Sequence, residues 1–487
     1  MEKQRILQEI ENVNARGPFH DDWQSIAAWE APKWYRDGRF GIFIHWGVFT
    51  VPEFANEWYP RNMYIQGSPE YEHHIKTYGP HREFGYKDFI PMFTAKRFDP
   101  EAWAALFEKS GARYVIPVAE HHDGFQMYKS ALSHWNAAEM GPKRDVLGEL
   151  KQSVERRGLI FGASSHRAEH CFFLGHGKEF DSDIKDPLAP GDFYWPSDPD
   201  RYNLDLFREA DASKDYLEDW LARTAELIDN YHPLVLYFDW WINQRSFHPY
   251  MRKLAAYYYN RCAEKGRMGV INYKYEAMPF GCGVPDMERG HFALVKPFAW
   301  QTDTSTALNS WCYTRQNEYR TPKEIICELV DVVSKNGNYL LNIGPKADGS
   351  LADEDVNILE SVGAWLRVNG EAIYGASPWR TFGEGPTNVR EGMFAEEKEM
   401  AYTSGDIRYT ARDGCLYCIA MAPSADGVYR AKSLGIMNGQ TLNYNPIVRR
   451  IVCLGAGEAS YRQTNEALEI HGPAGGEAPV VFRIEAE

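Results

Sequence analysis

The chain has 487 residues, of which 44% are hydrophobic and 25% charged, and it carries a formal net charge of −15 at pH 7. This length exceeds what one hydrophobic core usually serves, so we expect a large first domain and a smaller second one. The acidic balance argues against nucleic acid as a partner, because nucleic-acid binders concentrate Lys and Arg.

The N-terminal stretch "MEKQRILQEIENVNARG" is charged and helix-like, and it lacks the apolar core of a signal peptide. No later segment reaches the roughly 18 uninterrupted apolar residues that would span a bilayer. We therefore expect a cytoplasmic protein that has no membrane partner.

The first three quarters of the chain alternate short apolar runs with amphipathic stretches. The apolar runs that end in polar residues are 39–47, 112–125, 159–167, 234–241, 268–276, 298–303 and 338–345. The helices predicted between them are 100–110, 144–157, 213–231, 246–264, 322–335 and 353–370. Helix-start signals occur at Asp99-Pro100 and Thr321-Pro322. This alternation predicts parallel βαβ units and a (β/α)8-like (TIM) barrel, and no G-x-G-x-x-G follows a strand to suggest an open dinucleotide-binding sheet.

From about residue 380 the pattern changes. Short segments alternate polar and apolar residues and are separated by Gly, Asn and Asp turns. This is typical of a β-sandwich. We therefore expect a barrel domain over residues 1–378 and a C-terminal β-sandwich domain over residues 379–487.

In such a barrel, polar residues at the carboxyl ends of the strands converge on one pocket. That rule collects His45, His121, His122, His166, Asp239 and Lys274. Histidines with a carboxylate could bind zinc, but the H-x-H and H-E-x-x-H spacings are missing. Adjacent His121 and His122 would also point to opposite sides of a strand. We expect no metal.

A sugar-cleaving site accounts for the same residues better than a metal site does. Neutral imidazoles suit sugar hydroxyls, Trp suits the face of a sugar ring, and bond cleavage needs two carboxylates in opposite protonation states. Asp239 stands where the run "PLVLYFDWW" (233–241) stops being apolar, which makes it a candidate nucleophile. In the structural alternative, Asp239 caps the following turn or pairs with Arg245.

Five blocks of sequence carry a family resemblance. They are "RFGIFIHWGVFTVPEFANEWYPRNMY", "FTAKRFDPEAW", "AEHHDGFQMYKSALSHWN", "NGNYLLNIGPKADG" and "VNGEAIYGASPW". Together, in this order, they resemble the α-L-fucosidases of glycoside hydrolase family 29. The resemblance implies a retaining exo-glycosidase that acts through a covalent fucosyl-enzyme and needs no cofactor or metal. It also implies a distorted (β/α)8 barrel followed by a β-sandwich.

Site residues can be carried over from the family by position. Asp239 matches the nucleophile, and Glu288 in "PDMERGHF" resembles the acid/base, with Asp286, Glu276 and Glu169 as alternatives. The predicted substrate-binding residues are His45, Glu57, Trp58, His121, His122, His166, Lys274 and Trp300.

The chain departs from the family pattern at several positions. Ser164 and Ser165 replace two tyrosines, which opens the pocket there, and His166 could restore a donor. Gln301 replaces a carboxylate. Lys274 stands where relatives often have Arg, which binds carboxylates differently. These changes put the preferred leaving group and the turnover in question.

The sequence therefore predicts a retaining α-L-fucosidase. One alternative is a catalytically weakened fucose-binding protein of the same fold. Another is an exo-glycosidase for a related sugar such as an α-L-galactoside. An apolar wall near C6 of the sugar would favour fucose, and its candidates are Trp240, Trp241, Trp300 and Trp311. Oligomers are common in the family, so the resemblance also allows a homo-oligomer.

Overall fold

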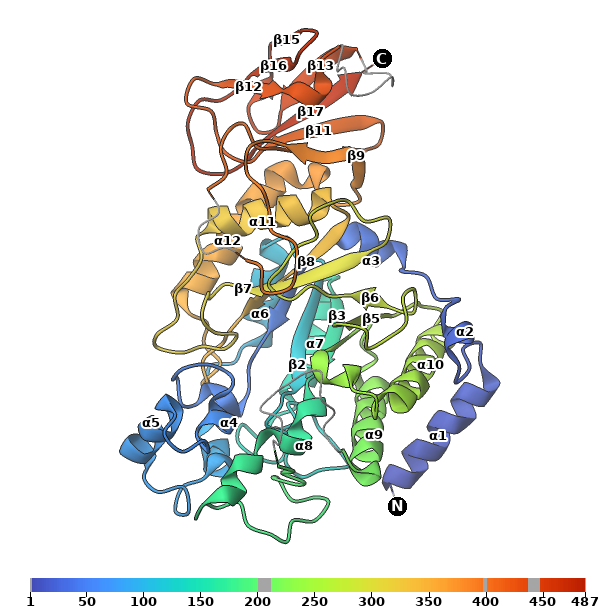
Figure 1. The fold of residues 1–487 in the computed structure, drawn as a ribbon, viewed down its shortest axis with the longest axis vertical. Helices are drawn as coiled ribbons and strands as arrows, with labels where there is room; N and C mark the ends of the chain where they lie inside the picture. The colour runs from blue at the N-terminus through green and yellow to red at the C-terminus, as the bar shows by residue number, and fades with distance from the viewer. Residues whose placement is uncertain (1, 200–211, 397–400, 437–446, 487) are drawn as a thin grey trace.

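The structure is a computed structural model that describes residues 2–199, 212–396, 401–436 and 447–486. It has a larger part built of helices and strands and a smaller β part that contains the C-terminus (Figure 1). Within these described ranges, no helix combines the length and the hydropathy that crossing a membrane requires. The cytoplasmic location stays a prediction.

Eight parallel strands form the central sheet of the larger part, in the order β6-β5-β4-β3-β2-β1-β8-β7. An isolated parallel bridge between Asp286 and Gln301 links the two edges, so the sheet nearly closes into a barrel. The strands are β1 (Phe40–Ile44), β2 (Tyr114–Glu120), β3 (Ile160–Ser165), β4 (Val235–Phe238), β5 (Val270–Tyr273), β6 (Val284–Pro285), β7 (Trp300–Ser305) and β8 (Gly337–Ile343). The predicted (β/α)8-like barrel is confirmed.

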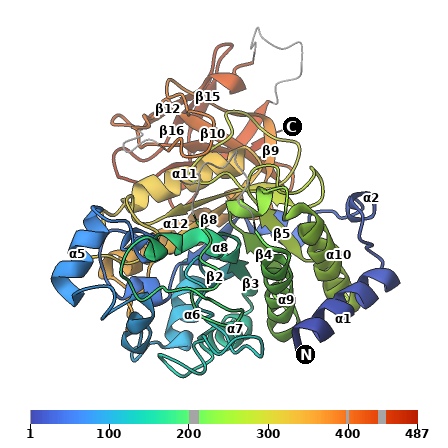
Figure 2. The same ribbon diagram turned by 60° about the horizontal axis from the view of Figure 1, so that its bottom comes forward.

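Helices cover the outside of this sheet, and α1 lies along α9 and α10 (Figure 2). They are α1 (Glu2–Arg16), α2 (Trp23–Ile26), α3 (Lys33–Gly38), α4 (Tyr59–Asn62), α5 (Pro69–Tyr78), α6 (Pro100–Lys109), α7 (Val146–Arg156), α8 (His170–Phe173), α9 (Lys214–Tyr231), α10 (His248–Glu264), α11 (Pro322–Ser334) and α12 (Asp353–Asn369). All six helices predicted from the amphipathic stretches are present. The fully described connections β5–β6 and β6–β7 contain no helix, which distorts the barrel.

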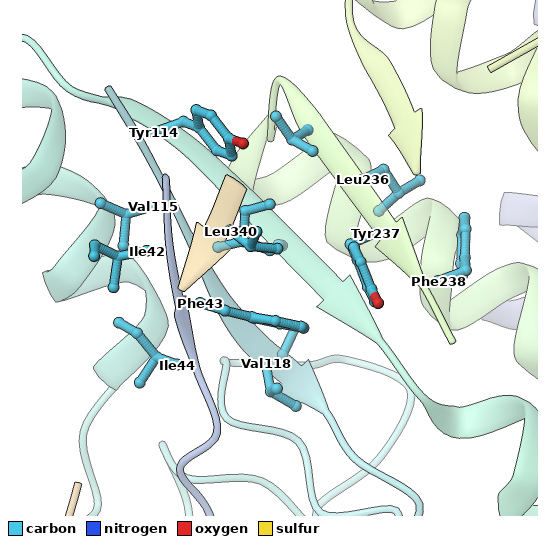
Figure 3. Close-up of a cluster of buried hydrophobic side chains, with 14 of the residues drawn as sticks. Ile42, Phe43, Ile44, Tyr114, Val115, Val118, Leu236, Tyr237, Phe238 and Leu340 are labelled. Atoms are coloured by element: carbon cyan, nitrogen blue, oxygen red, sulfur yellow. The ribbon is translucent and has the colours of Figure 1, made fainter. Parts of the chain in front are cut away.

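The barrel interior is filled by apolar side chains from every side. All five residues of β1 are buried, as expected of a parallel strand covered on both faces. Figure 3 shows Phe43 of β1 and Tyr237 of β4 among these side chains, and their ring centroids lie 4.8 Å apart. The core therefore holds the strands so that their carboxyl ends open at one mouth.

Local sequence explains where the helices begin. The Asp99 side chain accepts hydrogen bonds from the first backbone amides of α6. Thr321 and Glu324 form a capping box at the start of α11. Pro100 and Pro322 each occupy the first turn, where a missing N–H costs nothing. Both start signals read from the sequence are confirmed.

The smaller part consists of two antiparallel sheets with a hydrophobic core of their own. The six-stranded sheet has the order β14-β13-β17-β11-β10-β9, and the three-stranded sheet has the order β12-β16-β15. The strands are β9 (Ser377–Glu384), β10 (Ile407–Arg412), β11 (Cys415–Ala420), β12 (Val428–Ala431), β13 (Val448–Cys453), β14 (Gly457–Glu458), β15 (Tyr461–Gln463), β16 (Leu468–His471) and β17 (Val480–Ala486). The expected β-sandwich is confirmed. The division after residue 378 stays a prediction, and β9 crosses it.

Helix α11 joins the two parts, because it packs against β9 and β10 as well as β8. Asp331 on this helix receives Arg408 Nε of β10 at 2.6 Å and Lys335 Nζ at 2.6 Å. All three side chains are buried. An ion cluster of one carboxylate and two cations therefore fastens the sandwich to the barrel.

Candidate active site

The mouth of the barrel contains a cavity of about 330 Å³. Nine of the ten site residues predicted from the sequence line it, namely His45, Glu57, Trp58, His121, His122, His166, Asp239, Lys274 and Glu288. The same cavity is also lined by Asn56, Trp240, Asp303, Trp311 and Phe394. One pocket thus collects side chains that follow most of the barrel strands.

Asp239 is the first residue after β4, and the residue is 9% exposed. Its Oδ1 lies 3.1 Å from Lys274 Nζ, and its Oδ2 lies 3.3 Å from His166 Nδ1 and 3.5 Å from His122 Nε2. Burial alone would raise the pKa of this carboxyl, but Lys274 and His166 hold that pKa below its usual range. The side chain makes no cap bond to the following turn, and the partners just named do not include Arg245, so neither form of the structural alternative describes its contacts. Asp239 is an ionised carboxylate facing the cavity.

Lys274, the first residue after β5, contacts a second carboxyl group in addition to that of Asp239. Its Nζ lies 2.5 Å from Glu288 Oε2. Burial raises the pKa of Glu288 to about 7, and the attraction of Lys274 is offset by the nearby charges of Asp303 and Asp239. At pH values below about 7, Glu288 therefore keeps a proton that Asp239 has lost. The mouth holds two carboxyl groups in opposite protonation states.

Asp303 is a third carboxyl group at this point and was not predicted from the sequence. It lies within β7, where its Oδ2 accepts a hydrogen bond of 2.8 Å from the Tyr237 hydroxyl and lies 3.6 Å from Lys274 Nζ. It is the last residue of 298–303, one of the apolar runs that end in polar residues, but it was not selected as a site residue. One ammonium therefore faces three carboxyl groups.

Neutral imidazoles surround these groups. Burial lowers the pKa of His45, His121 and His122, that of His122 to about 3. His45 Nδ1 lies 2.8 Å from Asn342 Oδ1, and His122 Nδ1 lies 3.0 Å from the carbonyl oxygen of His166. If each Nδ1–H donates to that oxygen, the Nε2 of each neutral ring is left as an acceptor. Such rings suit uncharged hydroxyl groups.

The argument that His121 and His122 point to opposite sides was wrong. Both rings line the cavity, and their centroids are 4.2 Å apart. Strand β2 ends at Glu120, so the two residues lie beyond the strand and its alternation does not apply to them.

Several histidines of the cavity lie close enough together to be considered as ligands of a metal ion. Two sets of three potential ligand atoms lie within 4.8 Å of one another in the described residues: His45, His121 and His166, and His122, His166 and Asp239. The second set shares Asp239 with the Lys274 ammonium, whose charge opposes the entry of another cation. The expected absence of a metal stays a prediction.

Glu57 and three indoles form the remaining walls. Glu57 Oε2 accepts a hydrogen bond of 2.9 Å from the backbone N–H of Trp311, and burial raises the pKa of Glu57. Trp58 lies beside Trp240, with ring centroids 6.5 Å apart. Trp240 and Trp311 thus line the cavity, as two of the four suggested apolar wall residues.

Trp300 does not contribute to the pocket, and this prediction needs correction. It is the first residue of β7, so it lies at the opposite end of the strand from the mouth. Its indole N–H donates to the Lys335 carbonyl at 3.0 Å, and its ring packs edge-on against Phe292. Trp241 is also buried outside the cavity, against Phe172. Neither indole can face a sugar.

The alternatives to Glu288 lie elsewhere. Asp286 is buried and accepts a hydrogen bond of 2.7 Å from Gln301 Nε2. Glu169 is buried behind His122, with Oε2 3.2 Å from His122 Nδ1. Glu276 is exposed on a turn. Of the four candidates, Glu288 is the one that lines the cavity.

The departures around β3 and β7 have structural partners. Ser164 Oγ lies 3.1 Å from His166 Nε2, while the other ring nitrogen of His166 reaches Asp239. His166 therefore occupies the space beside the smaller Ser164 and supplies a polar group there. Gln301 Oε1 accepts hydrogen bonds from Tyr35 and Tyr114 inside the barrel, so this substitution lies below the pocket.

The small cavity contains an ionised carboxylate, a protonated carboxyl group and neutral hydrogen-bonding rings. This combination is typical of the active site of a glycoside hydrolase. A family model described as alpha-L-fucosidase matches residues 6–371. The tissue alpha-L-fucosidase of Rattus norvegicus is 32% identical over 88% of this chain and 85% of its own. The plasma alpha-L-fucosidase of Homo sapiens is 32% identical over 74% of this chain and 73% of its own.

Solved structures agree with the sequence relatives. The Thermotoga maritima alpha-fucosidase in complex with fucose has a TM-score of 0.76 and 29% identity, covering 96% of this chain and all of that one. The chain therefore belongs to the alpha-L-fucosidase family, and the resemblance to glycoside hydrolase family 29 is confirmed.

Proposed function

We propose that the protein is a retaining, exo-acting α-L-fucosidase that removes terminal α-L-fucosyl residues by double displacement. The observation that carries this proposal is the pair of carboxyl groups on one ammonium. Because Asp239 Oδ1 lies 3.1 Å and Glu288 Oε2 2.5 Å from Lys274 Nζ, these two oxygens are at most about 5.6 Å apart. That separation suits retaining glycosidases and is shorter than the roughly 6.5 Å or more of inverting ones.

In the first step, ionised Asp239 attacks the anomeric carbon of the fucosyl residue. Protonated Glu288 donates its proton to the glycosidic oxygen as the bond to the leaving group breaks. The products of this step are the free leaving group and a fucosyl ester on Asp239. The contrast in protonation between the two carboxyl groups supports these roles.

In the second step, the roles of the two carboxyl groups reverse. Glu288, now ionised, takes a proton from a water molecule, and the oxygen of that water attacks the anomeric carbon. The ester bond breaks, fucose leaves with retained configuration, and Asp239 is again a carboxylate. The ammonium of Lys274 balances whichever carboxyl group is negative, because it contacts both.

Sugar recognition falls to the neutral side chains of the pocket. His45, His121 and His122 offer ring nitrogens to hydroxyl groups without a charge that would demand a counter-ion. Trp240 and Trp311 provide apolar walls for the methyl group of fucose. A cavity of about 330 Å³ suits one monosaccharide ring, which supports exo action. The names of the relatives support fucose as that sugar.

The proposal is tested with a nitrophenyl α-L-fucoside. We expect the wild type to release nitrophenol and Asp239→Ala to lose roughly 10⁴-fold or more in kcat, since the nucleophile is gone. Azide should restore part of the rate and yield a fucosyl azide of inverted configuration. Glu276→Ala, which removes an exposed carboxylate, serves as the matched control.

Two outcomes would contradict the proposal. Wild-type rates in Asp239→Ala would remove the nucleophile assignment. Fucose binding by the wild type without any release of nitrophenol would favour a sugar-binding protein instead.

A further inference from the structure

A segment of the sandwich reaches the barrel mouth. Residues 391–396 lie between β9 and β10 and are here called the arm. They run along the loop that follows β6 (Figure 1). Gly392 and His291 form an antiparallel bridge. The backbone N–H of Phe394 donates to the carbonyl oxygen of Glu288 at 2.8 Å. The arm therefore holds the backbone of the residue that we propose as the acid.

Ion pairs fix the arm in place. The Glu396 carboxylate pairs with the buried Arg320 guanidinium and lies 3.7 Å from Arg289 Nη1. The Arg289 guanidinium in turn lies over the ring of Trp311, 4.7 Å from its centroid. Trp311 is itself a wall of the cavity. The anchoring thus continues from the arm into the pocket.

Phe394 is presented to the cavity in an unusual way. The residue is 56% exposed, yet it lines the cavity with Asp239 and Glu288. Its φ of 54° lies in the left-handed region, which a bulky side chain rarely occupies. Such strain persists only where the surroundings impose it, and it is concentrated at functional sites. The ring of Phe394 is an apolar surface held open at the rim of the pocket.

We propose that Phe394 forms the leaving-group side of the site, where its ring stacks on the flat C–H face of the sugar linked to fucose. This inference rests on the proposed function and adds a specificity-determining residue to it. The acid must lie next to the glycosidic oxygen, so the leaving group lies beside Glu288. The backbone of Phe394 is hydrogen-bonded to the backbone of Glu288, which places the Phe394 ring on the leaving-group side. The preferred leaving group is thus a pyranose with an apolar face.

The test compares two substrates that differ only in the leaving group. Methyl α-L-fucoside carries no ring beyond fucose, whereas a fucosyl disaccharide places a pyranose on the leaving side, and the leaving oxygen of both needs the proton of Glu288. We expect Phe394→Ala to lower the ratio of kcat/KM for the disaccharide over the methyl fucoside by about three- to tenfold, since one stacking contact is lost. Phe394→Trp should keep or raise that ratio. Phe280→Ala, which removes another exposed ring at 66% exposure, is the control and should leave the ratio unchanged.

The possible outcomes distinguish a failure of this inference from a failure of the proposed function. Equal losses on both substrates in Phe394→Ala would mean that the ring only supports the Glu288 loop, and they would overturn the inference. Unchanged kcat/KM values on both substrates would overturn it as well. A wild type that hydrolyses neither compound would overturn the proposed function, and the inference with it.

Discussion

Two buried ion clusters in this molecule have opposite charge balances. At the junction of barrel and sandwich, Asp331 is held by two cations, Lys335 and Arg408. Although burial opposes its charge, these two cations hold the pKa of Asp331 well below its usual range. Asp331 therefore carries no proton near neutral pH. The cluster fixes structure and contains no carboxylic acid.

At the mouth of the barrel the carboxyl groups outnumber the cations. One cation, Lys274, faces the carboxyl groups of Asp239, Glu288 and Asp303. Three negative charges cannot be balanced by one ammonium in a buried site, so at least one carboxyl group keeps its proton. An excess of carboxyl groups thus creates a carboxylic acid that can donate a proton, whereas an excess of cations keeps the carboxyl group ionised.

Of the variants that test this comparison, Glu288→Gln is expected to have the largest effect. The amide cannot donate the proton that the leaving oxygen needs, so kcat should fall roughly 10²- to 10⁴-fold for a disaccharide. The loss should be smaller for a nitrophenyl fucoside, whose leaving group needs little protonation. Steady-state kinetics on both substrates measure this. Equal losses on the two would show that Glu288 is not the acid.

The structural cluster should respond in stability instead. Asp331→Asn leaves the charges of Lys335 and Arg408 buried without their partner, which should cost about 3–5 kcal/mol in the free energy of unfolding. Urea unfolding measures this. Asp413→Asn, in an exposed pair with Arg412, is the matched control, with an expected cost of about 1 kcal/mol or less. Similar values for both variants would contradict the comparison.

Lys274→Met should shift the pH dependence of catalysis. The ammonium lowers the pKa of both Asp239 and Glu288, so its removal raises both pKa values, by roughly 1–3 units. Asp239 must be ionised and Glu288 protonated, so both limbs of the kcat/KM profile should move to higher pH. In the wild type the alkaline limb should lie near Glu288's pKa of about 7. Limbs that stay in place would mean that other groups titrate.

The smallest effect is expected from a chelator. Because Lys274 supplies the positive charge beside Asp239, activity should be the same before and after dialysis against EDTA. Loss of activity on chelation that Zn²⁺ restores would show that the histidine sets bind an ion needed for the reaction.

Much of the site followed from where apolar runs stop. His45, Asp239 and Lys274 are each the first residue after a strand, so the sequence marks them directly. The two-residue strand β6 was missed, because two residues show no periodicity. Trp300 was misplaced, since it was carried over from the family although it stands near the amino end of its run, away from the mouth. Phe394 could not be found, because its position depends on how the sandwich packs against the barrel.

The most direct test of the account is to trap the covalent intermediate. The wild type is treated with 2-fluoro-fucosyl fluoride, digested and examined by mass spectrometry for the modified peptide. We expect a single 2-fluoro-fucosyl ester on Asp239, the ionised carboxylate beside Lys274. An adduct on Glu288, Asp303 or any other residue would contradict the assignment of charge and proton at the barrel mouth.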